Sequence, residues 1–569
     1  METVLLGWRK VERLTRRRGV LVAGAALLVL AGLAEAFLSY IWSPWYKAQI
    51  ALHLLYAFGT AALILVLGRA TRPVPSPAWA PWVAMAGGFV VTALLAQVVM
   101  QAFPNSGDEY NYAYMAETFL RGRLWNAPLP KDVEDVFKTY YIADREGKRA
   151  SQYAPGWPAV LGLFRAVHLA QLANAVLGLL ACVFLWLGLG RLRVPPPVRL
   201  GAFMLGALAP FTLFNDASFY NHTLAAAALL AALWLDLRDA DAPSPWNRAG
   251  IGLAFAVMLT TRYEAFLIAF ALFAADGLAR KRWRFVPWCV PAAAAGIPIA
   301  ALLLWYNWRI TGSPFETTLA WASPEITYGP NSTGVEGQHS LARGLWHTAL
   351  WTLSWQDFAS VLILPLYAVA LRRRIRSRRV RWFDLLLPAL VAFFSFYPDF
   401  GGFQYGPRYW HLGHAALPLT VAAGMPAAGE LWQLGGWRLD PVRVALLQLA
   451  SFAGFTAGYA AFVHLQTEVR TAPLRIAAAA PPPALVLVPS QEQRYLPWQK
   501  AEQMQILSKD YTRNGLDDLD SVPVLMGRDL GPARTRSLCE RFADRHVFRL
   551  VLDNASPRGH LEPACASGP

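Results

Sequence analysis

The segment Phe103-Pro-Asn-Ser-Gly-Asp-Glu-Tyr-Asn-Tyr-Ala-Tyr-Met-Ala-Glu-Thr-Phe-Leu-Arg-Gly-Arg-Leu-Trp125 carries two adjacent carboxylates, Asp108 and Glu109, shortly after an apolar run. Ser106 with Glu109 three residues later is a capping-box pattern, which predicts a helix that starts near Gly107. Apolar side chains then recur at helical spacing and give this helix one apolar face. We expect it to lie on a membrane surface, with its acidic first turn at the bilayer edge.

The acid pair has two interpretations. Glu109 can serve only as the capping partner, and Asp108 only as an acid favoured by the positive end of the helix dipole. Alternatively, a carboxylate at the boundary between water and lipid is where a lipid-borne substrate would meet a general base. The second interpretation predicts catalytic roles for Asp108 and Glu109.

The composition is that of a membrane protein. Of the 569 residues, 55% are hydrophobic and only 16% are charged, whereas soluble domains have about a quarter of charged residues. Many apolar runs reach the roughly 20 residues that a membrane-spanning helix needs. The net charge of +15 lies mainly in short loops between these runs, so it indicates orientation in the membrane and no nucleic-acid partner.

The apolar runs predict an all-α polytopic fold with about 13 transmembrane helices. The first run follows a basic segment and is too long for the apolar part of a signal peptide, so we expect a retained span. Every basic cluster, the strongest being 372–381, falls on one side, which predicts a cytoplasmic N-terminus and an external C-terminus. The expected spans are about 19–41, 49–67, 81–100, 169–190, 198–215, 218–236, 248–260, 263–279, 285–306, 356–371, 382–398, 409–431 and 441–463.

Three regions follow from this pattern: a transmembrane domain over 1–465, an Ala/Pro-containing linker over 466–483, and a periplasmic α/β domain over 484–569. The first region should have large outer loops at about 102–155 and 307–355. In the last, strand-like and helical stretches alternate, with helices expected near 496–509 and 533–544. Cys539 and Cys565 in this domain can pair if it is extracytoplasmic.

Polar residues near the outer membrane edge are the other candidates for function. Ionisable groups at this depth are costly and usually line a cavity or a substrate path. Arg262 and Arg408 could instead reach the interface with their charged ends. His222 could hydrogen-bond between helices, and His339 could be a packing or solvated histidine. The candidate substrate-binding residues are His222, Arg262, His339, Tyr153, Arg408 and Tyr409.

Three motifs together resemble the GT-C superfamily of polyprenyl-phosphate-dependent glycosyltransferases, of the aminoarabinose-transferase and protein O-mannosyltransferase kind. They are Gly107-Asp-Glu-Tyr-Asn-Tyr112, Tyr153-Ala-Pro-Gly-Trp-Pro158 and Gly406-Pro-Arg-Tyr409, and their order and sidedness carry the likeness over roughly 100–465. The segments 218–222, 306–314 and 528–532 are similar to a bacterial branch of this group. The sequence departs from the pattern of this family in two ways. Two predicted spans precede the loop that carries Asp108 and Glu109, where many members have one, and no Lys-rich motif for the donor phosphate stands out.

The resemblance implies a sugar donor on polyprenyl phosphate and an acceptor that is a glycan, a lipid or a protein, at the outer face of the bacterial cytoplasmic membrane. Asp108 would be the base, or the carboxylate that orients a divalent ion such as Mg or Mn; no cofactor is certain. Arg408, and after it Arg262, would stabilise the departing lipid phosphate. Tyr153 and Tyr409 could stack on sugar rings. We expect Asp108, His222, Arg262 and Arg408 around one outward-facing cavity.

Three other classes of membrane protein are alternatives to a glycosyltransferase of this kind. A transporter or flippase for lipid-linked glycans would often show inverted repeats and broken helices at the midplane, and the sequence has no convincing repeat. A ligase for such glycans would be expected to have a large Arg-rich outer loop, whereas 307–355 holds little beyond Arg309 and Arg343. A membrane scaffold without catalytic activity is the third.

Overall fold

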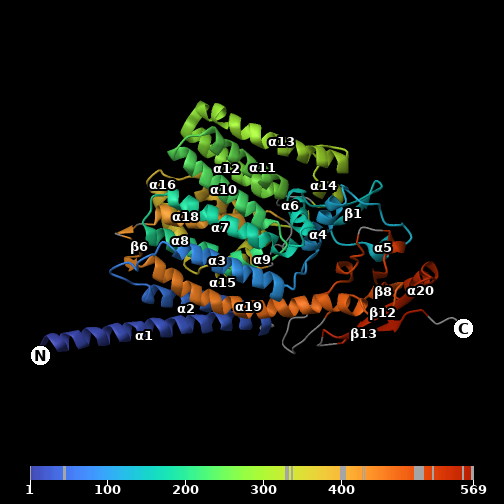
Figure 1. The fold of residues 1–569 in the computed structure, drawn as a ribbon, viewed down its shortest axis with the longest axis horizontal. Coiled ribbons are helices and arrows are strands. Elements are labelled where there is room, and N and C mark those ends of the chain that lie inside the picture. Colours follow the sequence, from blue (N-terminus) through green and yellow to red (C-terminus); the bar gives the residue numbers. More distant parts are fainter. Residues whose placement is uncertain are drawn as a thin grey trace.

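The structure is a computed structural model that describes residues 2–42, 46–326, 332–334, 337–397, 405–425, 427–428, 430–492, 505–515, 518–553 and 557–565. Helices dominate these residues (Figure 1). They are α1 (Glu2–Ala36), α2 (Tyr46–Leu67), α3 (Ala80–Leu94), α4 (Gly107–Leu120), α5 (Glu134–Phe137), α6 (Gly156–Ala166), α7 (Ala173–Arg191), α8 (Pro196–Ala207), α9 (Pro210–Ala217), α10 (His222–Asp241), α11 (Pro245–Thr261), α12 (Tyr263–Lys281), α13 (Phe285–Thr311), α14 (Thr318–Ala322), α15 (Leu341–Phe358), α16 (Ile363–Arg376), α17 (Leu386–Phe394), α18 (His411–Gly424), α19 (Pro441–Ala477) and α20 (Pro532–Arg541).

This is a multi-span membrane protein. Within the described residues, six helices are long and apolar enough to cross a membrane, or up to eight if each of two bent pairs is one span. The bent pairs are α8–α9, with a 50° angle, and α15–α16, with a 110° angle. The predicted number of about 13 spans is therefore not shown and stays a prediction. Helices also cover other predicted spans, but some are short, and α10 carries Asp236 and Asp239 near its end.

Several helix boundaries differ from the expectation, most of all those of α15 and α19. Residues 341–355 were predicted to belong to an outer loop, yet they form most of α15, whose Trp351 and Trp355 are buried. Helix α19 continues to Ala477, so residues 466–477 of the expected linker are helical. Both segments mix apolar and polar residues, and a hydropathy pattern that seeks continuous apolar runs does not recognise them as helix.

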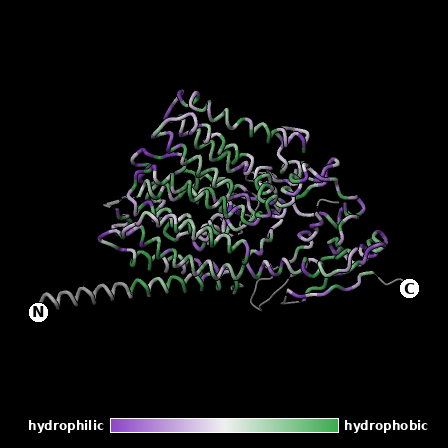
Figure 2. Tube along the Cα trace, in the orientation of Figure 1, coloured by the Kyte–Doolittle hydropathy of each residue, from purple (hydrophilic) through white to green (hydrophobic). Residues whose placement is uncertain are grey.

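The N-terminal helix packs along the last long helix. In Figure 1, α1 and α19 run side by side along the lower edge of the bundle, and α13 lies at the opposite edge. A Cβ atom at Gly32 or Gly454 would overlap the backbone of the facing helix, so these glycines permit the close approach. Figure 2 shows apolar residues along most of the helices and polar residues gathered in the connections and the C-terminal region.

The C-terminal region contains a four-stranded mixed sheet. Strand β8 (Ala484–Val488) lies between β11 (Val524–Arg528) and β12 (His546–Leu552), parallel to both, and β13 (Gly559–Pro563) pairs antiparallel with β12. All five residues of β8 are buried, as the continuous apolar sequence of a central parallel strand predicts. Helix α20 connects β11 to β12 and confirms the helix expected near 533–544.

The expected helix near 496–509 is not found in its described part. Residues 496–504 lie outside the described residues, Gln505–Ile506 forms the short strand β10, and Ser508–Asp510 forms a 3₁₀ turn. Cys539 and Cys565 are joined by a disulfide.

The loop at about 102–155 and the C-terminal region share one hydrophobic core. Val133 and Phe137 of the loop around α5 are buried together with Leu485, Leu525 and Phe542 of the sheet and α20. Two ion pairs border this core, Arg534 with Asp135 at 2.7 Å and Arg541 with Asp132 at 3.0 Å. The loop that begins with Asp108 is therefore packed on the C-terminal region as part of the same folded unit.

Candidate functional site

Asp108 lies in the first turn of α4. Ser106 has an extended backbone, and its hydroxyl accepts a hydrogen bond from the Glu109 backbone N–H at 3.2 Å. The prediction of a helix that starts at Gly107 is thereby confirmed. An acid in this turn interacts favourably with the positive end of the helix dipole.

The Asp108 carboxylate bonds to two residues that are distant in the sequence. Its Oδ2 accepts a hydrogen bond from Nη2 of Arg408 at 2.7 Å, and its Oδ1 accepts one from the Tyr153 hydroxyl. The side chains of Arg408 and Asp108 are only 8% and 15% exposed. A buried pair of this kind is disrupted at high cost when one partner is removed, because the other charge is then left unpaired.

Asp108 and Arg408 open onto a cavity of about 530 Å³. His222 and Arg262 line the same cavity, so the structure brings together the four residues expected to share one. The walls are rich in aromatic side chains with hydroxyl groups, which suit a ligand with both apolar and polar surface. These tyrosines are Tyr112, Tyr141, Tyr153, Tyr220, Tyr263, Tyr397 and Tyr409.

Arg262 provides a second buried cation at the cavity. It follows α11, and its Nη1 donates to the His222 ring, while its Nη2 lies 3.6 Å from the Glu264 carboxylate. Because a guanidinium only donates hydrogen bonds, the ring nitrogen that faces it must be an acceptor. The guanidinium carbons of Arg262 and Arg408 lie 5.6 Å and 5.8 Å from the centre of the Tyr409 ring, so both cations border one aromatic face.

Glu109 points away from the cavity. Its Oε1 accepts a hydrogen bond from the Phe219 backbone N–H at 2.9 Å, and the Asn105 backbone also donates to this carboxyl. Neighbouring residues of a helix project about 100° apart, which explains why Asp108 and Glu109 face different surroundings. Burial raises the pKa of Glu109 to about 7. The geometry gives Glu109 a place between α4 and the turn before α10, and none at the cavity.

We expect the substitution Glu109→Gln to change how stability depends on pH. The raised pKa means that the folded protein binds the proton more tightly than the unfolded chain, so stability falls as pH rises from about 4.5 through about 7. This rise in pKa corresponds to roughly 3 kcal/mol above pH 7. Glu109→Gln removes the charge, and its melting temperature in detergent should exceed that of the wild type at pH 8 and match it at pH 4.5. If the melting temperatures of Glu109→Gln and the wild type depended on pH in the same way, Glu109 would not be the group that lowers stability at high pH.

Other predicted residues are divided between the cavity and the packed interior. Tyr153 and Tyr409 line the cavity. His339 is buried elsewhere, with Nε2 at 3.1 Å from the Ser395 carbonyl oxygen, and the structure does not bring it to the cavity. Trp157, which belongs to the same motif as Tyr153, donates from its indole nitrogen to the Phe219 carbonyl at 2.7 Å.

Tyr220 was not among the candidate substrate-binding residues. The guanidinium carbon of Arg408 lies 4.1 Å from the centre of its ring, and its hydroxyl donates to Ser106 at 2.9 Å. Tyr220 thus contacts both Arg408 and Ser106, and Ser106 is the N-cap of the helix that carries Asp108. Its position in the motif Ser218-Phe-Tyr-Asn-His222 was the available signal.

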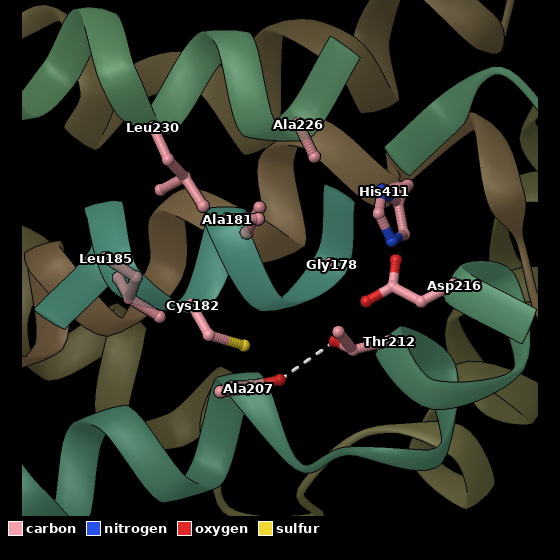
Figure 3. A pocket seen from close by; sticks show the side chains of 12 residues that line it. Gly178, Ala181, Cys182, Leu185, Ala207, Thr212, Asp216, Ala226, Leu230 and His411 are labelled. Carbon is pink, nitrogen blue, oxygen red and sulfur yellow. Dashed lines mark hydrogen bonds between the residues drawn. The ribbon is translucent and has the colours of Figure 1, made fainter. Parts of the chain in front are cut away.

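A second, much smaller cavity of about 30 Å³ lies among α7, α8, α9, α10 and α18. Figure 3 shows Asp216 and His411 facing each other at one end of it and Cys182 at the other. Its volume is enough for one or two water molecules. Neither ring nitrogen of His411 has a hydrogen-bond partner among the described residues, and its ring centre lies 6.1 Å from that of His222. His411 therefore lies behind His222, one layer removed from the large cavity.

The segment before Asp108 is held by residues from the C-terminal part of the chain. Arg513 lies over the rings of Phe103 and Tyr110, at 4.8 Å and 4.6 Å, and donates to the Pro104 carbonyl at 3.3 Å. Arg470 of α19 donates to the Asn105 carbonyl. The C-terminal region thus contributes directly to the position of the first turn of α4.

We expect Arg513→Ala to loosen the segment 103–110. The variant loses two cation–π contacts and a hydrogen bond, together about 1–3 kcal/mol of local stabilisation. Hydrogen–deuterium exchange should become faster for these amides, with little change at the distant helices. Arg536→Ala, at an exposed arginine of α20, is the matched control. Equal protection in Arg513→Ala and the control would mean that the C-terminal region does not hold this segment.

The surroundings of Asp108 do not form a metal site as they stand. The carboxylate is bonded to a guanidinium and a tyrosine hydroxyl, and the other carboxylate that lines the cavity, Glu264, lies near Arg262. Binding of Mg or Mn at Asp108 stays a prediction. Elsewhere among the described residues, Glu35, His53 and Asp357 form a group that could hold a metal ion.

A search with the sequence matches no family model and no curated protein. The fold resembles the crystal structure of ArnT from Cupriavidus metallidurans bound to undecaprenyl phosphate, with 13% sequence identity and a TM-score of 0.51. The match covers 87% of this chain and 100% of the ArnT chain. The protein shares the fold of this ArnT. The likeness inferred from the three motifs is thereby confirmed at the level of the fold.

Two other solved structures match with lower TM-scores. The oligosaccharyltransferase from Archaeoglobus fulgidus has 14% identity and a TM-score of 0.42, over 71% of this chain and 59% of its own. The arabinofuranosyltransferase AftD from Mycobacteria has 17% identity and a TM-score of 0.41, over 86% of this chain and 37% of its own. The assignment of the fold rests on ArnT.

Proposed function

We propose that this protein is an integral-membrane glycosyltransferase that moves a sugar from a polyprenyl-phosphate donor to an acceptor at the outer face of the cytoplasmic membrane. The observation that carries the proposal is the buried pair of Asp108 and Arg408 at a 530 Å³ cavity that Arg262 also lines. A base and two cations in one cavity suit the transfer of a group from an anionic leaving group. The GT-C fold, shared with an ArnT crystallised with undecaprenyl phosphate, supports the same conclusion.

The proposed reaction is a displacement at the anomeric carbon of the donor sugar. An oxygen or nitrogen atom of the acceptor forms a bond to this carbon, and Asp108 takes the proton that the acceptor loses. The bond from the anomeric carbon to the phosphate oxygen breaks, and its electron pair leaves with the lipid phosphate. Arg408 and Arg262 stabilise that anion, since guanidinium groups bind phosphate oxygens through two parallel hydrogen bonds. When the phosphate binds Arg408, the Asp108 carboxylate is released from its partner to act as the base.

The orientation in the membrane is part of the proposal. Arg381, at the end of the strongest basic cluster, pairs with Asp236 of α10 and Asp276 of α12, so these chain segments meet at one end of the bundle. An excess of Lys and Arg marks the cytoplasmic side. The disulfide between Cys539 and Cys565 suits an oxidising compartment for the C-terminal region. We therefore place the N-terminus inside, the cavity and the C-terminal region outside, and about 13 crossings between them.

The test uses the purified full-length protein. It is incubated with a panel of polyprenyl-phosphate sugars and candidate glycan, lipid and protein acceptors, with and without chelator, and products are identified by mass spectrometry. Release of polyprenyl phosphate together with a glycosylated acceptor is the expected result. Movement of a lipid-linked glycan across vesicle membranes, without transfer by any donor of the panel, would instead favour a flippase.

A further inference from the structure

Three ionisable side chains meet inside the helical bundle, outside the cavity described above. They are Glu35 on α1, His53 on α2 and Asp357 at the end of α15, exposed to 3%, 9% and 0%. His53 Nδ1 lies 2.9 Å from Glu35 Oε1 and 2.7 Å from Asp357 Oδ2. One candidate ligand atom from each residue lies within 4.8 Å of those from the other two. None of the three lines the 530 Å³ cavity.

The charges of this cluster balance only if it takes up a further proton or a cation. Two carboxylates carry two negative charges, and a protonated His53 would supply only one positive charge. Among the described residues, no Lys or Arg forms an ion pair with Glu35 or Asp357. An uncompensated charge among apolar spans is strongly unfavourable, and buried charges are usually paired or bound to a metal. A divalent cation with a neutral imidazole would bring the cluster to zero.

The hydrogen bonds of this cluster are also incomplete. The Nδ1 atom of His53 faces a carboxylate oxygen on each side but carries at most one proton. Asp357 Oδ1 is buried without a hydrogen-bond partner among the described residues. Ser39 donates to Glu35 at 2.5 Å and Tyr40 donates to Asp357 at 3.0 Å. Hydrogen bonds to carboxylates of this kind commonly orient metal ligands from the next layer.

We propose that Glu35, His53 and Asp357 bind a divalent transition-metal ion of the Zn²⁺ type. One imidazole nitrogen and two carboxylate oxygens are ligands that Zn²⁺ accepts, with a fourth position left for water. Ligand atoms in a tetrahedral zinc site lie roughly 3.3 Å apart, so the observed 2.7 Å and 2.9 Å spacings must open by about half an ångström. The ion would join α1 and α2 to α15, which gives it a structural role in attaching the two N-terminal helices to the bundle.

The experiment measures metal binding without any glycosyl transfer, so its outcome is independent of the function proposed above. The full-length protein, with any affinity tag removed, is stripped with chelator and titrated with Zn²⁺. The bound metal is counted by mass spectrometry, and the melting temperature is followed. We expect one tightly bound equivalent in the wild type and a rise in melting temperature on binding. His53→Ala and Asp357→Asn should bind Zn²⁺ at least tenfold more weakly.

Two matched controls separate this cluster from other sites. His464→Ala changes an exposed histidine that lies 3.6 Å from Glu468 and tests adventitious binding by a surface pair, and Asp108→Asn tests the cavity. Both should keep the wild-type stoichiometry. Titration of the wild type with Co²⁺ should also give the intense visible absorption of a tetrahedral site, a result that requires no variant to fold. A wild type that binds no stoichiometric Zn²⁺, or a His53→Ala variant with unchanged affinity, would overturn the proposal and identify a cluster that shares a proton.

Discussion

The Asp108→Asn variant is expected to lose glycosyl transfer by about 10²–10⁴-fold, the range that a general base contributes. Asparagine has nearly the same shape: its amide oxygen can accept a hydrogen bond from Arg408 and its NH2 group can donate one to the Tyr153 hydroxyl oxygen, but it cannot take the proton of the acceptor. The variant should still fold because both contacts of position 108 can be kept in weaker form, although loss of the ion pair with Arg408 lowers its stability. Initial rates with the purified variant and the best donor of the panel measure the loss.

Glu117→Gln is the matched control for this prediction. Glu117 belongs to the same helix and pairs with Arg165 at 2.7 Å, but its side chain is 30% exposed and does not line the cavity. Its substitution should leave the rate within a factor of two and the elution profile unchanged. If Asp108→Asn turned over like the wild type, Asp108 would have no role as the base, and another group would have to accept the proton.

The Arg408→Ala variant should bind the donor more weakly and transfer the sugar more slowly. Removing a group that stabilises the charge of a transition state typically costs about 2.7–4 kcal/mol, a loss of about 10²–10³-fold in rate. Arg408→Lys should recover only part of the activity because an ammonium group lacks the planar pair of donors. Binding of a polyprenyl-phosphate lipid to the detergent-solubilised variants, alongside initial rates, tests both effects.

Arg408 also neutralises Asp108, so its removal has two consequences that must be separated. The double variant Asp108→Asn/Arg408→Ala removes the unpaired carboxylate, and a double-mutant cycle then gives the coupling between the two residues. Affinity for the lipid phosphate should stay low in the double variant if Arg408 binds it directly. Wild-type affinity in Arg408→Ala, with a loss in Arg262→Ala, would assign the phosphate to Arg262 instead.

The sequence indicated individual residues that line the cavity, but it did not indicate which of them contact each other. Asp108 and Arg408 are 300 residues apart, and each was a candidate because it lies in a polar motif at a predicted membrane edge. Their direct contact depends on how the bundle packs, which no local pattern encodes. Glu109 and His339 were candidates by the same reasoning, yet their side chains turn into the packed interior. Spacing places a residue near a surface, whereas the direction of its side chain is decided by tertiary contacts.

The elements were predictable where a pattern was strong. The start of α4 was indicated by its capping residue, and β8 and β12 by short apolar runs. Helix α15 and the last turns of α19 were missed because their buried tryptophans and small residues alternate with polar ones. The number of crossings depends on bent pairs and short helices, whose relation to the bilayer is set by their neighbours.

The packing of the loop around α5 onto the C-terminal sheet has a consequence for biosynthesis. Thr139 of the loop and Thr512 of the C-terminal region contact each other across 373 residues. At about 5–20 residues per second, the ribosome needs roughly 20–75 seconds to make the intervening chain. During that interval α4 has been synthesised, but Arg513, which holds the segment before it, has not. The position of the first turn of α4 is therefore complete only after the C-terminal region has been made and has folded onto the loop.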